Sequence, residues 1–124
     1  MLKEEALTRE IVGAAIDVHR ELGPGLLEGV YEECLAFEFS ARGLSFERQL
    51  NVPLSYKGNA LNANLRIDLF VERRVVVELK SIAGVLPIHE AQLLTYLRLM
   101  RCPVGLLINF NVPVLKQGIT RRVL

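Results

Sequence analysis

Two apolar segments separated by three charged residues constrain the fold of this chain more than any other feature. Residues 65–71 (LRIDLFV) and 75–81 (VVVELKS) are rich in aliphatic side chains, and Glu72, Arg73 and Arg74 lie between them. Short apolar runs bounded by a polar turn predict a β-hairpin. Each run nevertheless contains charged residues where a buried strand should have none. These charges are the first indication of a functional site.

The register of the predicted hairpin follows from its hydrophobic pattern. With a three-residue loop, Val71 lies opposite Val75 and Asp68 lies opposite Glu78. A two-residue loop would shift the pairing by one residue and mix apolar and charged side chains on each face. The three-residue loop predicts one wholly apolar face, because side chains alternate across a strand. That face would contain Leu65, Ile67, Leu69, Val71, Val75, Val77 and Leu79, and the other Arg66, Asp68, Phe70, Val76, Glu78 and Lys80.

This register opposes two carboxylates. Directly opposed residues have Cβ atoms ~5 Å apart, so Asp68 and Glu78 should repel each other unless a positive charge lies nearby. Lys80 or Arg66 could supply it, and so could a divalent cation, because Mg²⁺ prefers carboxylate oxygens. The residues alone leave two interpretations open. One is a metal site, and the other is a network of salt bridges on an exposed face of the sheet.

The rest of the chain has helical and extended patterns. Apolar spacing predicts helices over residues 4–22, 27–42 and 88–101. The expected apolar stripe of the second helix is Val30, Cys34, Phe37 and Ala41. Alternating or continuous apolar runs predict strands over residues 45–56, 65–71, 75–81 and 105–110, with a further edge strand over 119–124. The order helix, helix, three strands, helix, strand predicts an α/β or α+β fold, with a mixed central sheet flanked by helices.

Length and composition set further limits. At 124 residues the chain has room for one domain, spanning residues 1–124. Hydrophobic residues make up 51% of it, which is high for a small domain, so a homodimer is expected. The net charge of +1, without a basic run, argues neither for nor against nucleic acid. No apolar run is long enough to span a membrane and no leader pattern is present, which favours a cytoplasmic location.

Two predicted helices carry further polar candidates. Glu28 lies in the first turn of the second helix, where the helix dipole favours a carboxylate. Gln92 and Tyr96 lie one turn apart on the third helix, beside an apolar stripe. Taken singly, each of these residues is better explained by a surface position or by hydrogen bonding within the fold. Their occurrence together with the hairpin carboxylates is what makes them candidates.

The segment GLLEGVY, residues 25–31, resembles the signature of the GxxExxY proteins, a group within the PD-(D/E)XK nuclease superfamily. The resemblance extends to IDLFVERRVVVELKS, HEAQLLTYL and GLLINFNVPVLKQGI, and so covers nearly the whole chain. It implies a restriction-endonuclease-like core with the order α-α-β-β-β-α-β. It also implies metal-dependent hydrolysis of phosphodiester bonds, with Mg²⁺ or Mn²⁺ as the cofactor.

The resemblance also implies roles for the hairpin residues. Asp68 matches the motif aspartate of the superfamily, and Glu78 and Lys80 match its (D/E)xK pair. Asp68 and Glu78 would bind the metal, together with Glu28, which matches the acidic residue of the helix. Lys80 would orient the attacking water or stabilise negative charge. Ile67 stands where the name of the superfamily expects proline, and its place on the apolar face explains this departure.

Two further matches lie on the helices. Gln92 and Tyr96 match the Q-x-x-x-Y motif of the branch that includes recombination exonucleases, and they would position Lys80, the water or a phosphate. His19 corresponds either to a histidine of that branch or to a packed helix residue, and packing is the favoured interpretation.

Two functions are compatible with these features. The favoured one is a metal-dependent nuclease acting on nucleic acid, with DNA favoured over RNA. The alternative is a non-catalytic, nuclease-like module for dimerisation or for binding nucleic acid or protein, which the modest charge and high apolar content support. The complete set of acidic and basic site residues favours the nuclease, because an inactive relative has no need to keep carboxylates at a repulsive distance.

Overall fold

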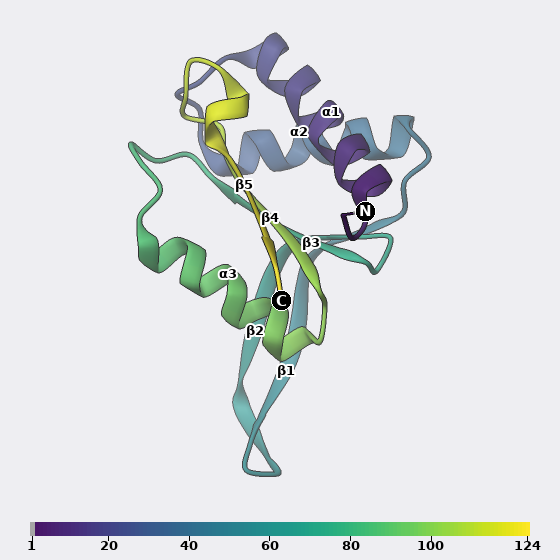
Figure 1. Ribbon diagram of the computed structural model, residues 1–124, viewed down its shortest axis with the longest axis vertical. Coiled ribbons are helices and arrows are strands. Elements are labelled where there is room, and N and C mark those ends of the chain that lie inside the picture. The colour runs from purple at the N-terminus through teal and green to yellow at the C-terminus, as the bar shows by residue number, and fades with distance from the viewer. Residues whose placement is uncertain (1) are drawn as a thin grey trace.

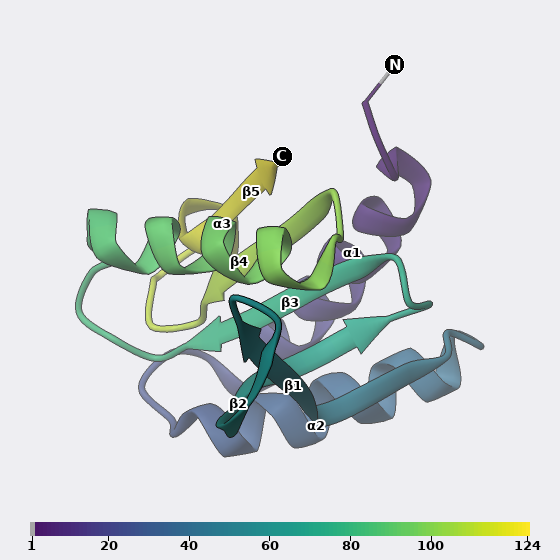
Figure 2. The same cartoon turned by 90° about the horizontal axis from the view of Figure 1, so that it is seen from below.

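The computed structural model describes residues 2–124 and consists of a β-sheet between helices (Figures 1 and 2). It confirms the predicted α+β class and the predicted order of elements. None of the helices in residues 2–124 combines the length and hydrophobicity needed to cross a membrane. The elements are α1 (Glu5–Leu22), α2 (Glu28–Ala41), β1 (Phe46–Tyr56), β2 (Asn59–Val71), β3 (Val75–Lys80), α3 (Pro87–Met100), β4 (Val104–Asn109), the 3₁₀ helix η1 (Leu115–Gly118) and β5 (Ile119–Val123).

The five strands form one mixed sheet in the order β1-β2-β3-β4-β5. All neighbours are antiparallel except β3 and β4, which are parallel. A parallel pair needs a crossover connection, and α3 supplies it. Figure 2 shows α3 on one side of the sheet and α2 on the other. One apolar cluster lies between the sheet and α1 and α2, and a second lies between the sheet and α3.

The predicted register of the β2–β3 hairpin is confirmed. Val71 pairs with Val75, and the pairing continues to Leu69 and Val77. Glu72 and Arg73 occupy the loop with φ values of 53° and 50°, in the left-handed region. The three-residue loop expected from the sequence therefore forms.

The expected single apolar face of this hairpin is wrong. Leu69 and Val71 pack into the cluster on the α1 and α2 side, but Leu65 and Ile67 pack into the cluster on the α3 side. Odd-numbered residues of β2 therefore face α1 and α2 after Asp68 but face α3 before it. Opposite this point, Gln49 of β1 has a φ of 46°, and the regular pairing of β1 with β2 omits Gln49 and Asp68. This local irregularity reverses the alternation that a regular strand would keep.

The expected apolar stripe of α2 is also wrong. Phe37 is 73% exposed and Val30 41% exposed. The buried face is instead formed by Tyr31, Leu35, Ala36 and Phe39. Apolar residues occupy two sides of α2, so periodicity alone did not identify the buried one.

Tyr31 anchors the buried face of α2. Its ring stacks on Phe110 at the end of β4, with 4.3 Å between ring centroids. Its hydroxyl donates a hydrogen bond to the carbonyl of Gly23 at 2.6 Å and accepts one from the backbone N–H of Leu26 at 3.1 Å. A tyrosine buried with its hydroxyl satisfied anchors a helix more specifically than an aliphatic residue does.

The β1–β2 pair extends beyond the sheet as a two-stranded ribbon (Figure 1). The strand β2 begins at Asn59, six positions before the predicted residue 65, because residues 59–64 pair with β1 although they are exposed. Pro53 lies beside the register shift of β1, an edge strand, as expected for proline in a sheet.

The packing of α3 on the sheet depends on a glycine. Leu93 and Leu97 of α3 are buried against β4, and a Cβ atom on Gly105 would lie 2.9 Å from a methyl carbon of each. Glycine therefore lets the helix approach the strand closely.

We expect Gly105→Ala to lower the free energy of unfolding by about 1–3 kcal/mol, because the two leucines must move out of their packed positions. Gly29→Ala is the matched control, since Gly29 lies in the first turn of α2 with no atom within 4 Å of an added Cβ. It should be neutral or stabilise by up to about 1 kcal/mol. Urea denaturation of both variants measures the difference, and equal effects would contradict this account of α3 packing.

Candidate functional site

Asp68 and Glu78 come together where the backbone pairing of β2 with β3 ends. The last backbone pair is Leu69 with Val77. Beyond it, the N–H of Asp68 donates to Oε1 of Glu78 at 3.1 Å, and the N–H of Leu79 donates to Oδ2 of Asp68 at 2.8 Å. Each carboxylate thus accepts a hydrogen bond from the backbone of the opposite strand. The two side chains replace the next step of the ladder and are held side by side.

The charge state of this pair differs from that of two exposed carboxylates. Glu78 is only 8% exposed. Burial, followed by the nearby charge of Asp68, raises its pKa to about 8, and Lys80 opposes the rise only in part. At neutral pH the Glu78 carboxyl therefore holds a proton, and that proton relieves the repulsion expected from the sequence.

The interpretation of the charges as a salt-bridge network does not describe this site. Lys80, the last residue of β3, is half-buried, and Arg66 is exposed. Among residues 2–124, neither forms an ion pair with Asp68 or Glu78. The amine of Lys80 lies near enough to Glu78 to lower its pKa, without being engaged by it.

Of the two helix α3 candidates, Tyr96 lies close to the carboxylates. Its half-buried phenol has a raised pKa, chiefly because of burial and then because of the charges of Glu78 and Asp68. Gln92, one turn earlier, is exposed. The charges of the carboxylate pair therefore act on Tyr96, whereas the side chain of Gln92 is exposed to solvent.

Glu28 is exposed in the first turn of α2. A hydrogen bond joins the residue after β3 to the segment before α2: the hydroxyl of Ser81 donates to the carbonyl of Leu26 at 2.5 Å. The end of β3 therefore lies beside the start of α2. Within residues 2–124, no hydrogen bond joins Glu28 to Asp68 or Glu78. Glu28 is thus near the same end of the sheet, and within residues 2–124 it has no hydrogen bond to the pair.

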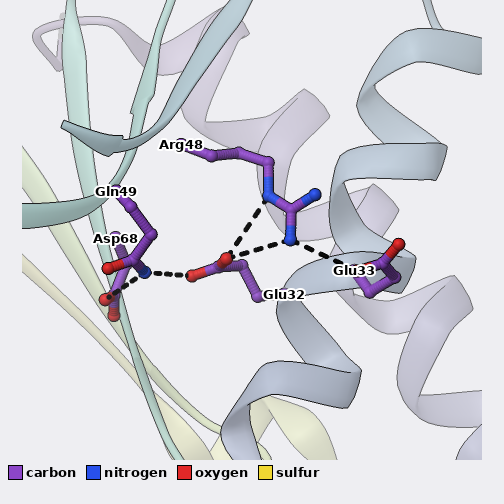
Figure 3. A network of polar contacts seen from close by, with 5 residues as sticks. All are labelled: Glu32, Glu33, Arg48, Gln49 and Asp68. Carbon is purple, nitrogen blue, oxygen red and sulfur yellow. Dashed lines mark hydrogen bonds and ion pairs between the residues drawn. The ribbon is translucent and has the colours of Figure 1, made fainter.

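A different glutamate connects α2 to the pair (Figure 3). The side-chain amide of Gln49 donates to Oε1 of Glu32 at 2.6 Å and to Oδ1 of Asp68 at 3.3 Å. Arg48 in turn donates to Oε2 of Glu32 at 3.1 Å and to Glu33 at 3.4 Å. This network ties Asp68 to both β1 and α2.

Sequence reasoning missed Gln49, because it reads as an ordinary polar residue of an edge strand. Gln49 lies opposite Asp68 only because of the way β1 pairs with β2. The sequence would have indicated Gln49 only if this register had been known in advance. Its left-handed backbone, which departs from the strand pattern, is not visible in the sequence.

Two buried polar residues support the same end of the sheet. Asn109 accepts a hydrogen bond from the N–H of Ile82 at 3.1 Å and donates one to its carbonyl at 3.1 Å, which holds the loop that follows β3. Nε2 of His19 donates to the carbonyl of Val112 at 2.8 Å. His19 is 8% exposed and packs near Phe110, in agreement with the favoured interpretation of a packed helix residue.

The donor atoms of the pair suit a hard divalent cation. Oδ2 of Asp68 and Oε1 of Glu78 are engaged by the backbone, and each carboxylate has a second oxygen that no N–H of the backbone engages. Within residues 2–124, no group of three or more His, Cys, Asp or Glu side chains is arranged to hold a metal. Two carboxylates nevertheless fit Mg²⁺ or Mn²⁺, because Mg²⁺ is usually bound by one or two carboxylates and keeps several waters.

The raised pKa of Glu78 predicts how the stability of the metal-free protein depends on pH. The unfolded chain loses the Glu78 proton near pH 4.5, whereas the folded chain keeps it up to about pH 8. The folded state is therefore progressively destabilised as pH rises between these values, by up to about 1.4 kcal/mol per pH unit.

Urea denaturation in EDTA between pH 5 and pH 8 measures this effect. Glu78→Gln is the matched control, because its amide oxygen can still accept from Asp68 while its side chain does not titrate. Its free energy of unfolding should vary less over this range. The same slope in both proteins would contradict the charge state assigned to Glu78.

A comparison with models of protein families relates most of the chain to a known superfamily. The family model of the PD-(D/E)XK nuclease superfamily matches residues 5–122, a span that includes Asp68, Glu78 and Lys80 as well as α2 and α3. The search of curated proteins found no match, and neither did the search of solved structures. On the extent of the family match, the chain belongs to the PD-(D/E)XK nuclease superfamily.

Proposed function

We propose that this protein is a nuclease that hydrolyses phosphodiester bonds of nucleic acid, DNA rather than RNA, with Mg²⁺ or Mn²⁺. One observation carries the proposal: Asp68 and Glu78 are held side by side, with Lys80 next to them, in a chain of this superfamily. We further propose that it acts in the cytoplasm, as expected from the sequence.

Asp68 and Glu78 would hold the ion, with Glu28 contributing directly or through water and the Leu79 carbonyl completing the set. When bound, the ion supplies a more acidic water and neutralises charge on the phosphate. Glu78 must lose its proton to become a ligand, so metal binding at neutral pH would release a proton. The hydrogen bonds from the two backbone N–H groups keep both carboxylates in place while this happens.

Lys80 would act on the substrate side of the pair. Its amine, free of any ion pair within residues 2–124, could orient the attacking water and stabilise the negative charge that develops on the phosphate. Tyr96, which lies near both carboxylates, would position Lys80 or a phosphate oxygen, with Gln92 assisting from the turn before. Gln49 and Glu32 would fix the orientation of Asp68.

We expect Asp68→Asn and Lys80→Ala each to reduce the rate of cleavage by about 10²-fold or more, because each removes a group that acts on the metal or on the developing charge. The assay incubates the protein with single-stranded, duplex and branched DNA and with RNA, in Mg²⁺ or Mn²⁺ and in EDTA. Lys116→Ala is the control, since Lys116 is an exposed lysine of η1 outside the site.

Cleavage that survives both substitutions would contradict the assigned site. If no substrate is cleaved and neither metal raises the melting temperature, the nuclease proposal fails. The non-catalytic module then becomes the preferred function.

One observation favours an additional role in self-association. Three large apolar side chains, Leu27 directly before α2 and Val30 and Phe37 within it, are 81%, 41% and 73% exposed, and we call them the α2 stripe. Large exposed apolar side chains that lie close together are typical of a protein interface. We propose that the protein forms a homodimer through the α2 stripe.

We expect light scattering after gel filtration to give the mass of a dimer for the wild type and of a monomer for Phe37→Lys. Leu61→Lys is the control, because Leu61 is also exposed, at 43%, but lies on the β1–β2 ribbon. A wild-type protein that remains a monomer at high concentration would contradict this proposal.

A further inference from the structure

A pocket lies beside the C-terminal end of α3. It has a volume of about 510 Å³. Its apolar lining includes Leu50 and Val52 of β1, Phe70 of β2, Met100 of α3 and Cys102. Pockets of 300–1,000 Å³ are typical of sites for small organic groups. Its lining includes none of the residues proposed to bind metal or to act in catalysis.

Two elements that line the pocket, β2 and α3, also carry residues of the candidate site. On the strand side, Phe70 lies two residues beyond Asp68 on β2, a distance of ~6–7 Å along the strand. On the helix side, Met100 lies one turn beyond Tyr96, ~6 Å along α3. Phe70, Tyr96 and Met100 all pack around the apolar cluster between the sheet and α3. One pocket residue on each element thus lies only two residues or one helical turn from a residue of the candidate site.

The charged residues of the pocket are mainly basic. Arg73, Arg74 and Arg101 line it, against a single carboxylate, Glu4. Arg74 pairs with Glu4, with 2.6 Å between Nη2 and Oε1, and Arg73 pairs with Glu47. Arg101 is exposed and forms no ion pair within residues 2–124. An apolar floor with an unpaired guanidinium beside it suits a ligand with a flat apolar part and an anionic part.

The ring of Phe70, in the floor of the pocket, has an arginine over its face. The guanidinium carbon of Arg73 lies 5.4 Å from the centroid of the Phe70 ring. Arginine stacks on flat π-systems and also binds phosphate, so Arg73 can contact either part of a nucleotide without leaving the pocket.

We propose that this pocket binds one unstacked nucleotide next to the cleaved phosphate, and that the substrate of the nuclease is therefore single-stranded nucleic acid or a single-stranded end. This inference rests on the proposed function. The base lies on the apolar floor, and Arg101 contacts the phosphate of the same nucleotide. In a duplex the bases are stacked and paired, so they cannot enter such a pocket, whereas single strands are commonly bound through unstacked bases and a basic groove.

Binding can be measured without cleavage, in EDTA, by fluorescence anisotropy. The probes are a labelled 12-nucleotide DNA of mixed sequence and the same DNA annealed to its complement. The wild type should bind the single strand at least about tenfold more tightly than the duplex. Arg101→Asn should raise the Kd for the single strand about fivefold to tenfold, because it removes a phosphate contact, and should leave the Kd for the duplex nearly unchanged.

Asparagine is the suitable replacement, because Arg101 has a φ of 54° and asparagine tolerates the left-handed region. Lys57→Asn is the matched control. Lys57 is also an exposed cation, with a φ of 49°, but it lies in the turn of the β1–β2 ribbon, outside the pocket. It should change the Kd for the single strand less than twofold. Denaturation curves of both variants establish that each is folded.

Equal binding of single strand and duplex would overturn the proposal, and so would equal effects of Arg101→Asn and Lys57→Asn. These outcomes are separate from failure of the nuclease function. A protein that binds single strands through Arg101 but cleaves nothing keeps the pocket and loses the activity. A protein that cleaves duplex DNA at the same rate with or without Arg101 keeps the activity and loses the pocket.

Discussion

The reciprocal hydrogen bonds between the carboxylates of Asp68 and Glu78 and the opposite backbones are the interaction on which the site depends. They replace the backbone ladder at the point where β2 and β3 separate. They join the two strands one residue beyond Leu69 and Val77, where the regular backbone pairing has ended. Because backbone N–H groups hold both side chains, the site is preorganised before any ligand arrives.

This arrangement changes the charge state of Glu78. Glu78 is buried beside another carboxylate, and its pKa of about 8 means that the metal-free protein keeps a proton there at neutral pH. In the function proposed above, a divalent cation would take the place of that proton and neutralise both carboxylates. A site that strains the charge balance of an otherwise apolar sheet is typical of functional rather than structural residues.

Three groups of residues around the carboxylate pair lie on different elements of the fold. The Gln49–Glu32 network fixes Asp68 from the β1 and α2 side, and Lys80 and Tyr96 approach from the end of β3 and from α3. The pocket beside Arg101 is lined by residues of the same strand β2 and helix α3. The site, the means of orienting it and the proposed nucleotide pocket are thus arranged around one irregular point of the sheet.

Much of this could be predicted from the sequence, because hydrophobic periodicity and turn residues act locally. They determined the order of elements, the three-residue hairpin loop and the opposition of Asp68 to Glu78. Only the tertiary structure decided the rest. The face of α2 that is buried is the one on which Tyr31 contacts Phe110. The alternation of β2 reverses opposite Gln49, which has a left-handed backbone. These features depend on partners far apart in the chain, so no local pattern of residues could reveal them.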